Sequence, residues 1–296
     1  EYCKSDSIAC LELALHFLPL ELALSRVSGV PFADSSRATT GQLVEALLVR
    51  EAFSRNEIVP NKPEGSEAAR RANNPIQGAF VATPEAGVYE NIAVLDFRSL
   101  YPSIIISHNV DLATLNCECC SEKESFVSPQ GHRFCAKRRG IIPETLNKII
   151  DERVALKKKM KALARDSKEY SQLDARQWAL KIIANSFYGY LGYSRSRWYS
   201  REAAESVTAW GRQYIQDTMK KAEENGFKVL YGDSVTSDRL VVLLDENGFL
   251  HVKNIEEFFE ERKSATEKFG EKEVVRANGW KCLSVNPATK KRSGRT

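Results

Sequence analysis

Apolar residues that recur every three or four positions predict most of the helices in this chain. The pattern predicts helices over residues 8–25, 40–55, 143–166, 173–188 and 201–224. In the second of these, Leu43, Val44, Leu47 and Leu48 repeat at an interval of four and share one face. The helices that begin near 143 and 173 are joined by a short polar turn, so we expect them to form an antiparallel hairpin.

Short apolar runs predict the strands. Residues 92–95 end at Asp96, and residues 227–231 lead into a tight turn at Gly232 and Asp233. We therefore expect an α+β fold in which Asp96 and Asp233 stand at two strand ends and can lie side by side. Upstream of both strands, the charged stretch at 60–75 contains Gly and Ser and predicts a loop or linker.

From residue 234 onward the pattern becomes mostly β. It predicts strands over 240–244, 249–252 and 280–285, a turn at 245–248 and an acid-rich helix at 255–261. This segment follows the preceding part without a linker.

Composition and length indicate a globular protein. The chain has 296 residues, of which 43% are apolar and 28% charged, enough for one large domain or about two average ones. The most apolar early stretch carries Glu12, His16, Glu21 and Arg26, so we do not expect it to span a membrane. Residue 1 is not a Met, and we expect the chain to be an internal fragment whose targeting cannot be read.

The net charge of +4 conceals a strong local excess of positive charge. The window 133–163 holds ten Lys and Arg against three acidic residues, a local charge of +7. Such a run is usually the solvated face of a helix. Here it coincides with the predicted hairpin, where it also suits the binding of phosphate groups.

The strand-end aspartates and the hairpin together suit phosphoryl transfer. That chemistry needs two divalent metals held by carboxylates, with cations on the phosphates. Arg153 and Lys157 lie one helical turn apart, and Lys181, Asn185 and Tyr188 share one face of the next helix. Taken singly, a strand-end Asp is more often a turn cap, and the second helix could equally present a solvated Lys and a core Tyr.

In order and spacing, three segments resemble the polymerase motifs of the family B DNA polymerases, most closely the archaeal type. They are residues 96–105 for motif A, 181–189 for motif B and 231–233 for the start of motif C. Tyr2 and Asp6 also resemble the third motif of that family's 3′–5′ exonuclease. The resemblance covers residues 1–233.

The resemblance implies a domain plan and a role for each matching residue. It implies the end of an exonuclease domain at 1–16, an inter-domain region and palm at 17–137, helical-hairpin fingers at 138–192 and the antiparallel palm again at 193–233. Asp96 and Asp233 would hold two Mg²⁺ ions. Arg153, Lys157 and Lys181 would hold the triphosphate, and Asn185 and Tyr188 would complete the nucleotide site. Tyr101 would lie under the deoxyribose and exclude a 2′-hydroxyl.

The chain departs from the family pattern at two places. Upstream of motif A, Ile76 and Gln77 precede Gly78-Ala79 where the family usually has a Tyr. In motif C the family continues from Tyr-Gly-Asp into Thr-Asp, whereas here Asp233 is followed by Ser234, and Asp238 is five positions on. One expected metal ligand is therefore missing, and we expect this fragment alone to be inactive.

The break after Asp233 resembles the insertion of an intein. Residues 234–296 are similar to the N-terminal, mostly-β part of a Hint-type intein, and Ser234 would be the splicing nucleophile that attacks the carbonyl of Asp233. A family-specific insertion in the hairpin is the alternative.

Cysteines form one compact group in the sequence. The chain has seven, too few and too unevenly spread for a disulfide scaffold, which favours a reducing compartment. Cys117, Cys119, Cys120 and Cys135, with His132 nearby, have a spacing that resembles a zinc site. The resemblance to archaeal polymerases implies a disulfide in this region as a second possibility, and free thiols are the third. The adjacent pair is awkward for one tetrahedral site, and the three states stay open.

The sequence thus predicts a template-directed DNA polymerase that adds dNTPs to a primer 3′-OH, with a truncated intein segment attached. Its expected partners are primer–template DNA, dNTPs, a sliding clamp bound elsewhere, and a complementary C-terminal intein and polymerase half. Its expected location is the cytoplasm, with no membrane involved. A catalytically inactive, nucleic-acid-binding scaffold is the alternative from another class, and an RNA-synthesising palm enzyme, against which Tyr101 argues, is the alternative from the same chemistry.

Overall fold

The chain divides into two compact units in the computed structural model. One unit comprises residues 1–77 and 101–210, and the other comprises residues 78–100 and 211–296. The structure describes residues 2–74, 76–82, 88–89 and 93–233, together with strands at 240–244, 250–254, 266–269, 272–276 and 281–283.

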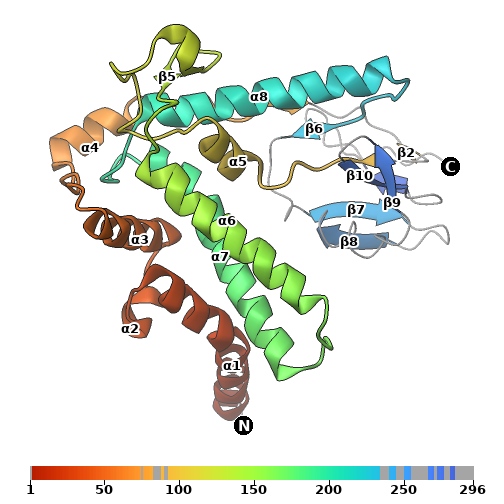
Figure 1. The fold of residues 1–296 in the computed structure, drawn as a ribbon. Helices are drawn as coiled ribbons and strands as arrows, with labels where there is room; N and C mark the ends of the chain where they lie inside the picture. Colours follow the sequence, from red (N-terminus) through yellow and green to blue (C-terminus); the bar gives the residue numbers. More distant parts are fainter. Residues whose placement is uncertain are drawn as a thin grey trace. The chain divides into compact units, whose positions relative to one another are not determined.

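The first unit is built on long helices (Figure 1). They are α1 (Tyr2–Ser28), α2 (Phe32–Ser35), α3 (Thr40–Ser54), α4 (Gly65–Ala72), α5 (Leu100–Ser107), α6 (Ile141–Met160), α7 (Lys168–Gly192) and α8 (Arg201–Glu224), the last of which continues into the second unit. Helix α7 packs against α1, α3 and α6, and α6 and α7 form the expected antiparallel hairpin.

An apolar core fixes this arrangement. In α3, Leu43, Val44, Leu47 and Leu48 are all buried, so the repeat at an interval of four predicted the correct inner face. Helix α7 buries Leu180, Ile183, Phe187 and Leu191 against its neighbours. Each such side chain contributes roughly 1.5–3 kcal/mol relative to an exposed one, which makes α7 the centre of the unit.

Helix boundaries follow local chemistry. Thr39 caps α3 in a capping box with Gln42, and the hydroxyl of Ser167 accepts from the N–H of Tyr170 at the start of α7. The predicted helix from Pro143 to about 166 was wrong at both ends, because α6 begins at Ile141 and ends at Met160. Just after Met160, the N–H of Ala162 donates a hydrogen bond to the carbonyl of Lys159, three residues back, so the α-helical pattern of bonds four residues back has ended.

Two predictions of local structure were wrong. The expected loop at 60–75 contains helix α4, in which Glu67 binds both Arg70 and Arg71. The expected strand at 227–231 is irregular. Gly226, with a φ of +83°, ends the turn after α8, and only Gly232–Asp233 form a strand, β6.

The second unit contains short antiparallel sheets. Strands β1 (Val81–Ala82) and β6 pair, and β7 (Leu240–Leu244) pairs with β8 (Leu250–Asn254) as the predicted hairpin, in a sheet ordered β2-β11-β7-β8. The other strands are β2 (Val88–Tyr89), β3 (Ala93–Val94), β9 (Thr266–Phe269), β10 (Lys272–Arg276) and β11 (Lys281–Leu283). The predicted turn at 245–248 and helix at 255–261 lie outside the described residues.

The strand pairing differs from the expected palm. Strand β3, which precedes Asp96, joins β10 and β9, whereas β6 pairs with β1, so these two strands lie in different sheets among the described strands. Strands β10 and β11, from the segment after 233, pair with β3 and β2. The described sheets therefore mix residues from both sides of the junction at 233.

The segment between α5 and α6 in the first unit contains a small β-hairpin. Strands β4 (Phe126–Val127) and β5 (Arg133–Phe134) pair, and a 3₁₀ turn at Glu122–Glu124 precedes them. This hairpin brings Cys135 back toward residues 114–120, since the N–H of Cys135 donates to the carbonyl of Thr114.

Candidate nucleotide-binding site

One face of α7 carries the expected motif B residues as a continuous row. Gln177, Lys181, Asn185 and Tyr188 follow one another at intervals of four, four and three, so they lie on the same side of the helix over roughly 16 Å. Gln177 and Lys181 are buried, whereas Asn185 and Tyr188 are half-buried.

Helix α6 contacts one end of this row. The guanidinium Nε of Arg153 donates to Gln177 Oε1 at 3.2 Å, and Gln177 donates in turn to Asp174 at 2.9 Å. Gln177 is one turn before Lys181, so α6 contacts the row one turn before that residue. Lys157 lies one turn further along α6, toward the turn of the hairpin.

Lys181 is held in a defined place. Its side chain is only 8% exposed, and its ammonium nitrogen lies 4.6 Å from the centroid of the Trp178 ring. A cation over an indole face is stabilised by the ring quadrupole, and this interaction strengthens when water is excluded. A largely buried cation of this kind suits a ligand that brings negative charge.

The other end of the row meets the segment that resembles motif A. The rings of Tyr101, in α5, and Tyr188 lie with centroids 4.7 Å apart at an interplanar angle of 46°. The structure therefore brings together two aromatic residues that are 87 positions apart and that the sequence assigned to the same nucleotide site.

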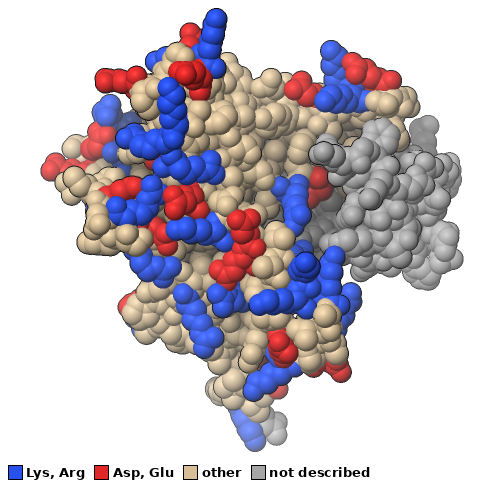
Figure 2. Space-filling model, in the orientation of Figure 1, with Lys and Arg blue, Asp and Glu red and all other residues tan. Residues whose placement is uncertain are grey.

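The basic window divides into two kinds of residue. Lys137, Arg138, Arg139 and Lys148 all make structural contacts with carbonyls or carboxylates. The last turn of α6, in contrast, presents Lys158 and Lys159 to solvent. Figure 2 shows the resulting concentration of Lys and Arg where α6 ends.

The aspartates belong to the second unit. Asp96 lies two residues after the end of β3 with an exposed side chain, and a carboxylate is the ligand type that Mg²⁺ prefers. Asp233 is the second residue of β6 and pairs with Val81 through the backbone, while its side chain lies outside the described residues, as does all of Ser234. Tyr2 and Asp6 lie one turn apart on α1, both exposed.

Sequence reasoning missed the residues that anchor the start of α6. Asp111 is fully buried and accepts hydrogen bonds from the N–H groups of Ile142 and Ala113, both at 2.8 Å. Asn109 accepts from the N–H of Gly140 at 3.0 Å. Burial raises the pKa of Asp111, while the two N–H donors act in the opposite direction. The sequence did contain a signal for this anchoring, because Asn109 and Asp111 have short polar side chains that commonly hydrogen-bond to backbone N–H groups.

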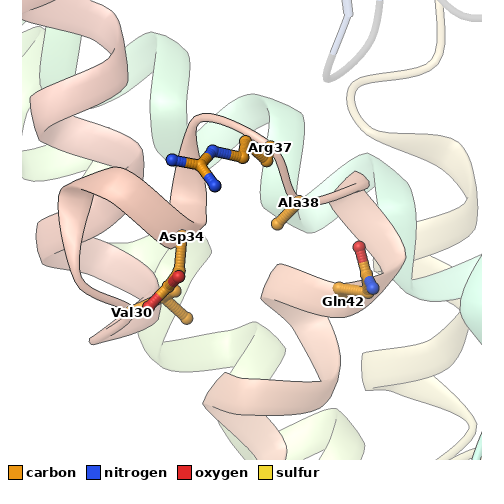
Figure 3. A pocket seen from close by; sticks show the side chains of 5 residues that line it. All are labelled: Val30, Asp34, Arg37, Ala38 and Gln42. Carbon is orange, nitrogen blue, oxygen red and sulfur yellow. The ribbon is translucent and has the colours of Figure 1, made fainter.

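Two further features lie apart from the row. An open pocket of about 280 Å³ is lined by Val30, Asp34, Arg37, Ala38 and Gln42, none of which the sequence predicted for nucleotide binding (Figure 3). Among the described residues, helix α1 is long and apolar enough to cross a membrane by length and composition. Core helices of soluble proteins and signal sequences meet the same two criteria, so the expectation that this stretch does not span a membrane stays a prediction.

Comparisons with known proteins match the predicted family. A family model described as DNA polymerase family B matches residues 31–255. The DNA polymerase of Thermococcus gorgonarius is 53% identical over 235 residues, and DNA polymerase 1 of Pyrococcus abyssi is 51% identical; each alignment covers 79% of this chain and 30% of the relative. This chain thus spans less than a third of the length of these relatives.

A solved structure with a similar fold also comes from this polymerase family. The family B DNA polymerase of the hyperthermophilic archaeon Pyrobaculum calidifontis aligns with a TM-score of 0.64 and 33% identity, over 93% of this chain and 36% of that one. Since the family model covers well over half of the chain and the fold agrees, the chain belongs to DNA polymerase family B.

Proposed function

We propose that this chain provides the nucleotide-binding region of a DNA-directed DNA polymerase, which adds dNTPs to a primer 3′-OH on a template strand. The observation that carries the proposal is the row on α7, which Arg153 contacts at one end and Tyr101 at the other. Cations at one end and aromatic rings at the other match the two ends of a nucleoside triphosphate.

Within this proposal each residue has a chemical task. Arg153, Lys157 and Lys181 neutralise the triphosphate, and the amide of Asn185 orients it beside them. The ring of Tyr101, braced by Tyr188, lies under the deoxyribose, where a 2′-hydroxyl has no room.

Asp96 and Asp233 are the proposed ligands of two Mg²⁺ ions. Bound there, the ions would activate the primer hydroxyl and stabilise the charge of the pyrophosphate leaving group. The carboxylate of Asp96 is exposed and chemically suited to this task. Primer–template DNA and a sliding clamp are the proposed macromolecular partners.

Equilibrium binding of a fluorescent dNTP in Mg²⁺ tests the proposal. We expect Lys157→Gln and Lys181→Gln to weaken binding by roughly tenfold or more, because each removes a cation from the triphosphate. Lys220→Gln, an exposed cation near the end of α8, is the matched control. A chain that binds duplex DNA but no dNTP would instead favour the scaffold alternative.

A second proposal concerns residue 234. We infer that Ser234 begins protein splicing: its Oγ attacks the carbonyl carbon of Asp233, the Asp233–Ser234 amide bond breaks, and the hydroxyl proton passes to the freed amine, leaving an ester. The sequence break inside motif C supports this, as does the β7–β8 hairpin. The pairing of β10 and β11 with β3 and β2 argues against a self-contained element.

At neutral pH hydroxylamine cleaves such an ester and leaves ordinary peptide amides intact, whereas alkaline hydroxylamine is avoided because it also cleaves the Asn-Gly bonds at 225–226, 247–248 and 278–279. We expect it to split the chain into residues 1–233 and 234–296, which mass spectrometry would identify. Ser234→Ala should abolish the cleavage and Ser237→Ala should not. An uncleaved chain would leave the ordinary insertion as the explanation.

A further inference from the structure

Four cysteines gather between α5 and α6, away from the row on α7. They are Cys117, Cys119, Cys120 and Cys135, referred to below as the four-cysteine cluster. Their Sγ atoms all lie within 4.8 Å of one another. Cys120 and Cys135 are buried, at 7% and 0% exposure, whereas Cys119 is exposed and Cys117 is half-buried.

Three of the sulfur atoms have the spacing of the corners of a tetrahedron, and the fourth, from Cys117, lies within 4.8 Å of them. A zinc ion with Zn–S bonds of about 2.3 Å requires sulfur atoms roughly 3.8 Å apart. The Sγ of Cys135 lies 3.4 Å from that of Cys119 and 3.7 Å from that of Cys120, and the latter two are 3.9 Å apart. The adjacent cysteines, which looked awkward in the sequence, therefore both turn toward Cys135.

Backbone hydrogen bonds hold this geometry. The N–H of Cys135 donates to Thr114, which brings the end of β5 beside the loop that carries the other three sulfurs. The N–H of Arg138 donates to the Sγ of Cys135 at 3.2 Å, and such a hydrogen bond to sulfur stabilises a thiolate that binds a metal. The ammonium group of Lys137 donates to the carbonyl of Cys119 at 3.0 Å, which adds positive charge beside the cluster.

We propose that the four-cysteine cluster binds one structural zinc ion. Four thiolates satisfy the tetrahedral preference of Zn²⁺ and leave no position open for a substrate, so the ion would stabilise the fold and take no part in a reaction. The four thiol protons pass to solvent on binding.

The position of the cluster indicates what the ion would stabilise. The amide nitrogen of Asn109 donates to the carbonyls of Cys135 and Arg138, and its Oδ1 accepts from Gly140 at the start of α6. A metal at the cluster thus fixes the N-terminus of the helix that carries Arg153 and Lys157.

A disulfide is the main competitor, and it has a different stoichiometry. One disulfide within the cluster uses two sulfurs and excludes a four-thiolate site, whereas zinc keeps every thiol reduced. Metal content and thiol count together therefore distinguish the two states.

The experiment uses the full chain, purified without chelator after expression with zinc. We expect about one zinc per chain by elemental analysis, all seven thiols to titrate in denaturant with EDTA, and Co²⁺ substitution to give the intense absorption of tetrahedral thiolate coordination. Cys119→Ser should lower the zinc content at least about fivefold. Cys10→Ser, an exposed cysteine of α1, should leave it unchanged.

Because a variant could fail for reasons of folding, the wild-type chain carries an independent test. Removal of the metal by chelation should lower its melting temperature, and added Zn²⁺ should restore it. Less than a tenth of an equivalent of zinc, two fewer titratable thiols, or a Co²⁺ complex without thiolate bands would each overturn the proposal.

Discussion

Gly140 is the residue at which one added methyl group should be most costly near α6. A Cβ built there would lie 2.5 Å from the Cβ of Asp111, a buried side chain that cannot move without losing its bonds to Ile142 and Ala113. We predict that Gly140→Ala destabilises the chain by roughly 1–3 kcal/mol, measured by denaturant unfolding.

Gly65→Ala is the matched control for that experiment. Gly65 begins α4, and a Cβ there would meet nothing within 4 Å. The free energy of unfolding should change by less than about 0.5 kcal/mol. Equal losses in both variants would contradict the steric explanation at Gly140.

Substitution of Tyr101 tests directly whether the proposed site distinguishes deoxyribose from ribose. Tyr101→Ala should reduce the preference for dATP over ATP on the order of 10- to 100-fold, since a ring that blocks a hydroxyl gives discrimination of that size. The measurement is the ratio of the two dissociation constants. Tyr101→Phe keeps the ring and should keep the preference, and Tyr193→Ala, at an exposed Tyr just after α7, controls for loss of an aromatic side chain. An unchanged ratio in Tyr101→Ala would remove the sugar-sensing role.

Helix α4 shows how ion pairs act at the scale of an element. Hydrogen bonds from Arg70 and Arg71 lower the pKa of Glu67 to about 2. A carboxyl whose folded-state pKa lies below its unfolded value stabilises the fold above about pH 4.5, and this stabilisation is lost as the pH falls toward 2. Arg71 also donates to the carbonyls of Ser194 and Ser196, so α4 is tied to the segment after α7.

Glu67→Gln should therefore loosen α4 at neutral pH only. We predict amide exchange in residues 68–72 to be roughly twofold faster than in the wild type at pH 6, with no difference near pH 2. Glu64→Gln removes the same charge from a side chain that makes no capping hydrogen bond and should have a smaller effect. A difference that persists at low pH would show that the carboxylate is not its cause.

The same helix shows which elements can be predicted from sequence. Helices α3 and α8 have long apolar repeats, and their predicted bounds agree with the structure to within one residue. Helix α4 was missed because Gly65, Ser66 and its charges resemble a loop, although the spacing of Glu67 with Arg70 and Arg71 already allowed ion pairs on a helix. The run at 227–231 has the composition of a strand, yet Phe227 and Tyr231 are half exposed and no described strand pairs with them.

The site residues, too, could be predicted where they lie on one helix and could not be predicted where distant segments meet. Lys181, Asn185 and Tyr188 could be assigned to one face because helical spacing fixes their direction. The contact between Tyr101 and Tyr188, and the convergence of Cys119 and Cys120 on Cys135, depend on how distant segments fold back. Spacing along the chain carries no information about such contacts.

At the scale of the whole molecule, the distribution of charge matters more than its total. A net charge of +4 is small, and four of the ten basic residues in the window 133–163 make structural contacts. The exposed remainder concentrates where α6 ends (Figure 2). If duplex DNA bound through net charge alone, the loss of affinity would not depend on which cation was removed. If DNA binds through individual phosphate contacts, each contact releases its own counterions, so the position of the removed cation matters.

Salt titration of duplex binding separates these two cases. The double variant Lys158→Gln/Lys159→Gln should lower the slope of log K against log salt concentration by about 1 to 2, because each lost phosphate contact accounts for roughly 0.9. Lys220→Gln/Lys221→Gln, in the last turns of α8, changes the net charge equally and should leave the slope nearly unchanged. Equal reductions in both double variants would mean that the chain attracts DNA through its overall charge, and the basic end of α6 would then have no special part in binding.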